Sequence, residues 1–383
     1  MDFSCTKNDL VAGVKLASYA LGARTSMPIL SGMKMELSGK RLSLQSTDLE
    51  RAVRCEIPIE NEHKDESVVL NGTVLTQIAA HLPEDERVTL KTDSTNGSVV
   101  KVRCGEASFD LPTLPVEDYP QIPELPKEQI ATLKLAQFHR AFEQTAFACL
   151  KAGETTRLSL TGVDLVLTGK ALKMVATNGY RLAMKTVEAG DVVAETEYLI
   201  EAGVLADLDR VLSQIGAEEV HLHKGDGQVF FHAGNVTFMA KTIAEEFPDF
   251  ERVIPKDNPI GLVFDRRALL EALQRIEITA AEESGAVTVR VTPDESAARI
   301  NSSSKEKGEA EERVRLKKVP GKGLEISFKA EYLIDAVKRM SSEEVAFWLA
   351  APEKAGLLEP HGDRISLDDA GFLYVCMPVR LGS

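Results

Sequence analysis

The stretch "AEEFPDFERVIP", residues 244–255, repeats the plan of "VEDYPQIP", residues 116–123. In both, two acidic residues precede an aromatic–proline pair, and the pairs Tyr119-Pro120 and Phe247-Pro248 lie 128 positions apart. Each pair opens a Pro-bearing connection that leads to a strand-like run and then an amphipathic helix. Because self-similarity at a fixed period indicates a repeated architecture, this spacing predicts domains that recur every 128 residues.

The repeat continues at half-steps. Short alternating runs such as "RLSLQST" (41–47) and "ALKMVAT" (171–177) are typical of strands. Chance spacing is the alternative, but it leaves the matching boundaries unexplained. We predict an α+β fold of three similar domains, residues 1–127, 128–255 and 256–383, each with two helix-plus-strands units whose helices cover one face of antiparallel sheet. Helix-like apolar spacing recurs at 64-residue steps around Leu10, Val74, Phe138, Ala202, Arg266 and Ala330.

Composition narrows the class of protein. The net charge of −14 argues against a protein that grips nucleic acid over its whole surface, but it is compatible with a locally basic channel. No run of 18 apolar residues predicts a membrane span, and "MDFSCTKNDL" does not resemble a signal peptide. The five cysteines are scattered and form no CxxC pair, which favours a reducing cytoplasm over a disulfide framework or zinc site.

Catalytic and metal-binding patterns are scarce. "TGKALK" (168–173) resembles the end of a phosphate loop but lacks its Ser or Thr, so a hairpin turn is the better interpretation. His221, His223 and His232 would be a metal site only with further ligands, and surface histidines are the simpler interpretation. Acidic runs such as "GEAEER" (308–313) leave paired carboxylates open, although no pair stands out. The pattern favours a binding or scaffolding protein without cofactor or metal.

One stretch in the middle of the chain combines a turn with residues that suit a binding site. In "ATNGYRLAM", residues 176–184, Asn178-Gly179 between apolar runs predicts a tight hairpin turn. The turn does not explain why Tyr180 and Arg181 follow it directly, because both are residues that commonly grip partners.

Five motifs in register carry a resemblance to a known family. They are "GARTSMPIL" (22–30), "LPTLPVEDYP" (111–120), "ATNGYRLA" (176–183), "FPDFERVIP" (247–255) and "YVCMPVRL" (374–381). In order and spacing, and over essentially the whole chain, they resemble the bacterial DNA polymerase III beta subunits, the sliding clamps.

The resemblance implies a fold and a function. Members are head-to-tail homodimers of three-domain subunits, closed into a ring with helices around the hole. They have no catalytic activity, and they encircle duplex DNA without reading its sequence and tether polymerases to it. Implied partners are the polymerase III catalytic subunit, the clamp loader, translesion and repair polymerases and mismatch repair proteins, on nucleoid DNA in the cytoplasm. A nucleic-acid enzyme on clamp-like domains, or a clamp-like scaffold without ring closure, are the alternatives.

The resemblance also implies a pocket between the second and third domains that receives short linear peptides. Leu and Val side chains suit an apolar floor, and the arginines suit the rim. One family member has His in place of Tyr180, Asp in place of Asn178 and Met in place of Val379. It ends before the positions of Gly382-Ser383. The implied lining is Arg157, Leu160, Thr177, Gly179, Tyr180, Arg181, Leu182, Pro248, Arg252, Val253, Val375, Met377, Pro378, Val379 and Arg380.

Basic residues on the predicted helices are candidates for the DNA channel, and Arg24 matches the family's DNA-contacting loop. Leu158 and Ser159 stand where the family member has adjacent tyrosines, so we do not expect aromatic contact with single-stranded DNA there. The other candidates rest on helix position alone: Lys15, Arg140, Arg210, Arg266, Arg267, Arg275, Lys338 and Arg339.

The ring joints should pair an edge strand of the first domain with one of the third. Phe109 and Leu111 match one side of the joint, and Ile278 matches the other. Glu309, Glu311 and Glu312 match an acidic stretch that faces basic residues in the family, whereas "CGEASF" (104–109) replaces that basic stretch here. We therefore expect the joint to depend mainly on apolar burial.

Overall fold

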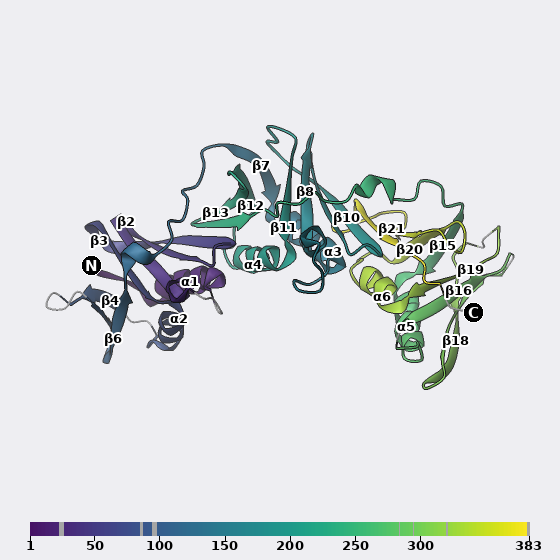
Figure 1. Cartoon of the computed structure of the whole chain (residues 1–383), viewed down its shortest axis with the longest axis horizontal. Helices are drawn as coiled ribbons and strands as arrows, with labels where there is room; N and C mark the ends of the chain where they lie inside the picture. The colour runs from purple at the N-terminus through teal and green to yellow at the C-terminus, as the bar shows by residue number, and fades with distance from the viewer. Residues whose placement is uncertain are drawn as a thin grey trace. The chain divides into compact units, whose positions relative to one another are not determined.

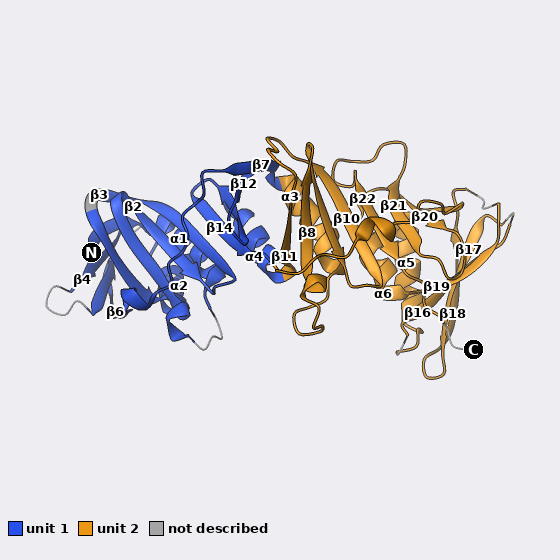
Figure 2. Ribbon diagram, turned by 45° about the horizontal axis from the view of Figure 1, so that its top comes forward, with its two compact units in different colours: residues 1–135, 203–242 blue, residues 136–202, 243–383 orange. Residues whose placement is uncertain are grey.

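We analysed a computed structural model of the chain (Figure 1), which describes residues 1–22, 27–84, 87–93, 98–282, 284–293, 295–318 and 321–380. The chain packs as two compact units. Unit 1 holds residues 1–135 and 203–242, and unit 2 holds residues 136–202 and 243–383 (Figure 2).

The predicted helix repeat is confirmed. The described residues form six α-helices that begin 63 to 67 residues apart, and each helix follows directly after a strand. Side-chain caps begin several of them: Thr6 accepts a hydrogen bond from Asp9 N, and Asp265 accepts one from Ala268 N. The helices are α1 Lys7–Ala17, α2 Gly72–His81, α3 Leu135–Thr145, α4 Ala202–Leu212, α5 Arg266–Glu277 and α6 Ala330–Lys338.

Unit 1 is built on one antiparallel sheet with the order β1-β4-β5-β6-β3-β14-β13-β12-β7, and β2 pairs with β3. Helix α1 packs against β3 and α2. The strands are β1 Asp2–Thr6, β2 Gly32–Thr47, β3 Arg51–Asn71, β4 Arg87–Thr92, β5 Val99–Cys104, β6 Ala107–Leu114, β7 Gln129–Lys134, β12 Glu219–Lys224, β13 Gln228–Ala233 and β14 Val236–Lys241.

Unit 2 holds two antiparallel sheets, with the orders β11-β8-β9-β10-β22-β21-β20-β15 and β18-β17-β16-β19, and α5 packs against α6. The strands are β8 Gly162–Thr168, β9 Ala171–Thr177, β10 Arg181–Glu188, β11 Thr196–Glu201, β15 Ile260–Asp265, β16 Ala286–Val291, β17 Ala297–Ser304, β18 Gly308–Arg315, β19 Leu324–Lys329, β20 Glu344–Leu349, β21 Gly356–His361 and β22 Phe372–Cys376.

Strands far apart in the sequence join the sheets. β14 pairs with β3, with Met239 opposite Ala52, and β10 pairs with β22, with Leu182 opposite Val375. We call these two pairings the first joint (β3–β14) and the second joint (β10–β22). Because each sheet continues through its joint, the predicted central domain, residues 128–255, contributes strands to both units. Its boundaries therefore differ from those of the compact units.

The α+β prediction is confirmed, and so are the strands predicted at 41–47 and 171–177. "TGKALK" spans the end of β8 and the start of β9, and its Gly169-Lys170 form the turn between them, where Gly169 has a φ of +59°. All five cysteines are free. Among the described residues, no helix has the length and apolar character that a membrane crossing requires.

Candidate partner-binding groove

The Asn-Gly turn between β9 and β10 is closed by its own side chains. Asn178 Oδ1 accepts hydrogen bonds from Tyr180 N (2.9 Å) and Arg181 N (3.0 Å). Thr177 Oγ1 donates to Arg181 O (2.7 Å) and accepts from Gly179 N (3.1 Å). Gly179 has a φ of +86°, where a side chain would be strained. The predicted tight turn is confirmed, and it fixes the directions of the two residues that follow.

Those two residues have opposite surroundings. The side chain of Tyr180 is 67% exposed, whereas Arg181 is only 9% exposed. The Arg181 guanidinium donates to Asp335 Oδ2 (2.7 Å) and Phe147 O (2.6 Å) and lies 4.5 Å from the centre of the Tyr332 ring. These partners fix its position, so the rim position expected for Arg181 is not observed. Tyr180 is the residue that the turn presents.

The turn, the connection at 248–253 and the end of β22 enclose a cavity of about 180 Å³. The C-terminal segment is held to the turn because Met377 N donates to Tyr180 O (2.9 Å). Two lining residues, Asp249 and Phe250, were not predicted, although the second aromatic of "FPDF" is a signal for one of them. The predicted residues that line the cavity are Arg157, Leu160, Thr177, Gly179, Tyr180, Arg181, Leu182, Pro248, Val253, Val375 and Met377.

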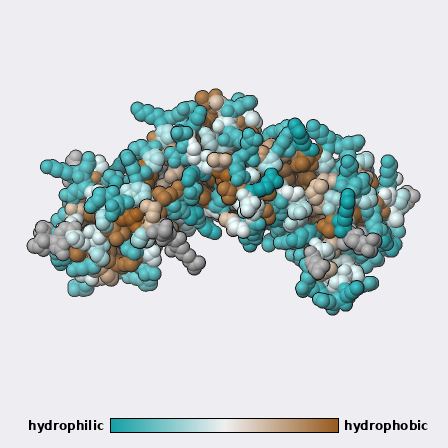
Figure 3. Space-filling model, viewed as in Figure 1, coloured by the Kyte–Doolittle hydropathy of each residue, from teal (hydrophilic) through white to brown (hydrophobic). Residues whose placement is uncertain are grey.

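The floor of this groove is apolar and buried. Val175, Leu182 and Val375 form a buried cluster from three adjacent strands, and Phe247 and Phe250 of the connection pack against it. Around the mouth, Tyr180, Val253 and Met377 remain exposed. Hydrophobic residues gather over β10 and β21 in Figure 3, the face on which these strands are labelled in Figure 1. Exposed apolar side chains around a buried apolar floor are typical of a protein-binding site.

Four predicted pocket residues lie outside this cavity. Arg252 is exposed, forms an ion pair with Asp249 (Nε–Oδ2 2.6 Å) and lines a neighbouring hollow. Pro378, Val379 and Arg380 continue past the cavity mouth, and Val379 N donates to Ser327 O of β19 (2.8 Å). Gly382-Ser383 lie outside the described residues.

Among the predicted channel residues, Arg24 lies outside the described residues. Lys15 and Lys338 are exposed on α1 and α6. Arg266 donates to Ser342 O (2.8 Å). Three others are exposed but form ion pairs on or near their own helices: Arg210 with Asp207, Arg267 with Glu271, and Arg275 with Glu312 and Glu271.

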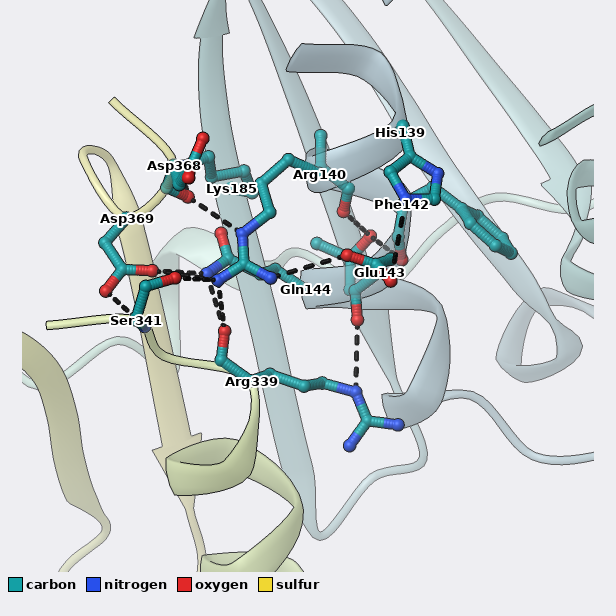
Figure 4. Close-up of polar contacts among 12 residues, drawn as sticks. His139, Arg140, Phe142, Glu143, Gln144, Lys185, Arg339, Ser341, Asp368 and Asp369 are labelled. Atoms are coloured by element: carbon teal, nitrogen blue, oxygen red, sulfur yellow. Dashed lines mark hydrogen bonds and ion pairs between the residues drawn. The ribbon is translucent and has the colours of Figure 1, made fainter. Parts of the chain in front are cut away.

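Arg140 and Arg339 belong to a hydrogen-bond network instead (Figure 4). The guanidinium of Arg140 donates to Arg339 O (2.6 Å), Ser341 Oγ (2.8 Å) and Asp369 Oδ1 (3.0 Å). Arg339 donates to Glu143 O (3.1 Å), and its guanidinium lies 4.0 Å from the centre of the Phe147 ring. The guanidinium groups of these two residues therefore bond within the protein, and their contact with DNA phosphate stays a prediction.

The same network contains two buried charged groups. Lys185 is fully buried, and its Nζ donates to the carbonyl oxygens of Asp368 and Ala370 (2.7 Å each). Burial lowers the pKa of Lys185 to about 8. Burial opposes ionisation of Asp369, but hydrogen bonds from Ser342 N and Ser341 N and the charge of Arg140 outweigh it and hold its pKa below the usual value. The network thus ties α3 to the loops before β20 and β22.

The predicted ring joint involves two sheet edges and the end of α5. Residues 107–112 of β6 pair with β5 on one side, with Phe109 partly exposed and Leu111 buried. On the other side β6 pairs with β3 only at Thr113 and Leu114, so within the described residues this edge is open. β18 is the end strand of its sheet and carries Glu309, Glu311 and Glu312. Ile278 is exposed directly after α5.

The histidines are placed by strand pairing. His221 lies opposite His232, and the His223 and His232 rings are 6.4 Å apart between their centres. The last two rings have hydrogen-bond partners of their own. His223 Nδ1 contacts Pro126 O, and His232 Nδ1 contacts Thr237 Oγ1. In the part of the chain that the structure describes, no three His, Cys, Asp or Glu side chains are arranged to hold a metal ion.

Comparison with known proteins gives a consistent result along the whole chain. Family models of the DNA polymerase III beta subunit match in three consecutive stretches: the N-terminal domain at residues 1–123, the central domain at 132–249 and the C-terminal domain at 251–380. A beta sliding clamp of Pseudomonas putida is 30% identical over 383 residues, covering all of both chains. One from Staphylococcus aureus is 28% identical and covers 95% of this chain and 96% of its own.

Solved structures show the same fold. The DNA polymerase III subunit beta of Pseudomonas aeruginosa matches with a TM-score of 0.90 at 28% identity, covering 100% of each chain. The DNA polymerase sliding clamp of Bacillus subtilis matches with a TM-score of 0.91 at 25% identity, again over 100% of each chain.

Proposed function

The chain belongs to the DNA polymerase III beta subunit family and is a DNA sliding clamp, and we propose that its partner proteins bind by short linear peptides in the groove described above. The observation that carries this proposal is the apolar cavity of about 180 Å³ with three exposed apolar side chains at its mouth. A peptide that inserts two apolar side chains would cover surface that is otherwise exposed to water.

We also propose that two copies close head to tail into a ring, through the open edges of β6 and β18. Both edges offer unpaired backbone groups for antiparallel pairing. Phe109, Leu111 and Ile278 would supply the apolar part of this interface between the two copies. The three domains would then be residues 1–127, 128–255 and 256–383.

Duplex DNA would pass through this ring without sequence readout, so the protein would act without catalysis. Weak phosphate attraction is sufficient for a ring that holds DNA by topology, and the tethered polymerase gains effective concentration at its template. The candidates for this attraction outside the network of Arg140 and Arg339 are Arg24, Lys15, Arg210, Arg266, Arg267, Arg275 and Lys338.

The partners that we propose are those of the family. They are the polymerase III catalytic subunit, the clamp loader, translesion and repair polymerases and mismatch repair proteins, acting on nucleoid DNA in the cytoplasm. One groove per chain would make these partners compete for the same site.

Deletion of residues 377–383 tests the groove. It removes Met377 from the cavity mouth and the hydrogen bond to Tyr180 O, so a fluorescent clamp-binding peptide of the Gln/Leu/Phe type should lose binding. Deletion of residues 381–383 alone is the matched control and should leave affinity unchanged. Unchanged affinity in the longer deletion, with an intact dimer by size-exclusion chromatography, would show that the groove is misplaced.

Retention on DNA tests ring closure. The protein should elute near twice 41.8 kDa and remain on circular DNA while sliding off linear DNA. Equal loss from both templates would favour a scaffold without ring closure, and turnover of a nucleic-acid substrate would favour an enzyme.

A further inference from the structure

A second hollow of about 530 Å³ adjoins the groove. It lies between the connection at 251–258 and the β20–β21 turn at 350–355, and Val253 lines both cavities. We infer that this hollow, the flank site, binds the stretch of a partner chain that adjoins the peptide motif and selects flanks with an acidic residue beside an apolar one. The inference rests on the proposed function of the groove.

The walls of the flank site are held in place by the protein itself. Asn258 Nδ2 donates to Trp348 O (2.9 Å) and to Ala355 O (3.0 Å), which fixes the connection to the β20–β21 hairpin. Ile254 and Ala355 pack against the same buried cluster of Val175, Leu182 and Val375 that forms the groove floor. A preformed site loses little conformational entropy when a ligand binds, so less of the favourable contact energy is offset.

The apolar lining of the flank site suits an apolar side chain of the partner, either before or after the peptide motif. Besides Val253, the lining contains Ile254, Pro255, Ala350 and Ala355. The volume is within the range of about 300–1,000 Å³ typical of ligand sites, whereas the groove itself is smaller. The flank site therefore has room for several residues of a peptide.

The charged residues of the flank site indicate which peptide flank it binds. Two of the five charged lining residues already have partners: Glu251 pairs with Lys173 and Arg252 pairs with Asp249. Within the described residues, the remaining three have no ion pair, and they are Lys256, Lys354 and Asp257. Two cations against one anion favour an acidic flank, and exposed charges of this kind add modest affinity that falls with salt.

The test uses peptides and the full-length dimer. Fluorescence anisotropy would compare the motif alone, the motif with an Asp/Glu- and Leu-containing extension at either end, and the same extensions with Asn/Gln in place of the acids. We expect one acidic extension to raise affinity about five- to tenfold, the neutral version to raise it less, and 0.5 M NaCl to reduce the acidic advantage.

The double variant Lys256→Glu/Lys354→Glu should lose the acidic gain while its affinity for the motif alone changes less than twofold. Lys170→Glu/Lys224→Glu carries the same charge change on exposed lysines outside the flank site and should keep the gain. Ala350→Trp fills the hollow without changing charge and should reduce the gain of both extensions.

Three outcomes would overturn the inference. They are equal binding of motif and extended peptides to the wild type, a gain that survives in Lys256→Glu/Lys354→Glu, and displacement of the acidic flank by a single-stranded oligonucleotide. If the motif alone binds without any gain from extension, only the flank site fails. If the motif does not bind at all, the groove fails and the flank site with it.

Discussion

The turn at 47–51 and the turn at 177–181 have the same hydrogen bonds, 130 positions apart. Thr47 Oγ1 donates to Arg51 O and accepts from Leu49 N, and Asp48 Oδ1 accepts from Glu50 N and Arg51 N. Thr177 and Asn178 make the equivalent four bonds in the second turn. The two joints therefore share one backbone plan, and their differences come from side chains.

At the first joint the side chains close the surface. Lys241 N donates to Glu50 O (2.8 Å), as Met377 N does to Tyr180 O, but here the two side chains form an ion pair (3.1 Å). Ala52, Phe230 and Met239 fill the space beneath, with Ile122 and Leu125 packed against them. The nearby hollow of about 640 Å³ is polar, with the ion pairs Arg54–Glu124 and Arg41–Glu56 on its walls.

At the second joint the same positions leave an apolar groove. Tyr180 and Met377 replace the ion pair and stay exposed. One feature is common to both joints, because Arg51 pairs with Asp207 of α4 as Arg181 pairs with Asp335 of α6. In both joints the arginine fixes the turn onto a helix. The residue before it and the packing beneath it determine whether the surface carries an ion pair or an exposed apolar groove.

Arg181→Ala should have the largest effect. It leaves Asp335 with Arg339 as its remaining ion-pair partner (3.2 Å) and removes the bond to Phe147 O, so we expect a loss of about 3 kcal/mol in the free energy of unfolding, measured with urea. Peptide affinity should fall more than tenfold because the turn loses its anchor. Asp335 lies outside the cavity lining, so Asp335→Asn should weaken peptide binding only through loss of its ion pair with Arg181.

Arg51→Ala is the matched control for this prediction. It should lower the urea midpoint through loss of the Asp207 pair but change peptide affinity less than twofold, because Arg51 anchors the first turn and does not line the apolar groove. If Arg51→Ala weakened the peptide as much as Arg181→Ala does, the anchoring of the second turn would not be the cause.

Exchange of the mouth residues should reduce peptide affinity without the loss of stability expected for Arg181→Ala. Tyr180→Glu/Met377→Lys gives the second joint the ion pair of the first, and calorimetry should show at least a tenfold loss of peptide affinity, about 1.4 kcal/mol. The melting temperature should change little, since exposed ion pairs contribute about 0–1 kcal/mol.

The reciprocal variant, Glu50→Tyr/Lys241→Met, should gain no peptide binding. Phe230 and Met239 already fill the space that a peptide side chain would need. Measurable binding at the first joint would show that the mouth residues alone make a groove.

Asp164 offers a pH-dependent contrast of intermediate size. Burial, with help from the charge of Glu197, raises its pKa from 3.8 to about 7, whereas Lys34 at the corresponding place in β2 pairs with Glu36. The native carboxyl keeps a proton between pH 4 and 7 where the unfolded one has lost it, so its contribution to stability falls as pH rises through that window. Asp164→Asn should add about 2 kcal/mol at pH 8 and little at pH 4.5, by urea titration at both values.

The sequence predicted the helices well because apolar periodicity is a local property of each segment. It also predicted most of the cavity lining, through the resemblance of whole motifs. It did not predict that Arg181 is buried or that Arg140 and Arg339 join a network, because their partners Asp335, Phe147 and Asp369 are remote in the chain. Nor did it reveal the second hollow, which needs the hairpin turn at 350–355 beside the connection.

The two turns also differ in how visible they are in the sequence, and this gives the smallest prediction. The pair Asn178-Gly179 is a recognisable turn signal in the sequence, whereas Asp48-Leu49 is not. Leu49 nevertheless adopts a φ of +78°, close to that of Gly179. Gly179→Leu should cost about 1 kcal/mol of unfolding free energy, since a side chain is strained at positive φ. Leu49→Gly should gain about 0.5 kcal/mol, because relief of strain exceeds the added freedom of the unfolded chain. A loss of stability in Leu49→Gly, by urea denaturation, would show that the Leu49 side chain contributes contacts that outweigh its backbone strain.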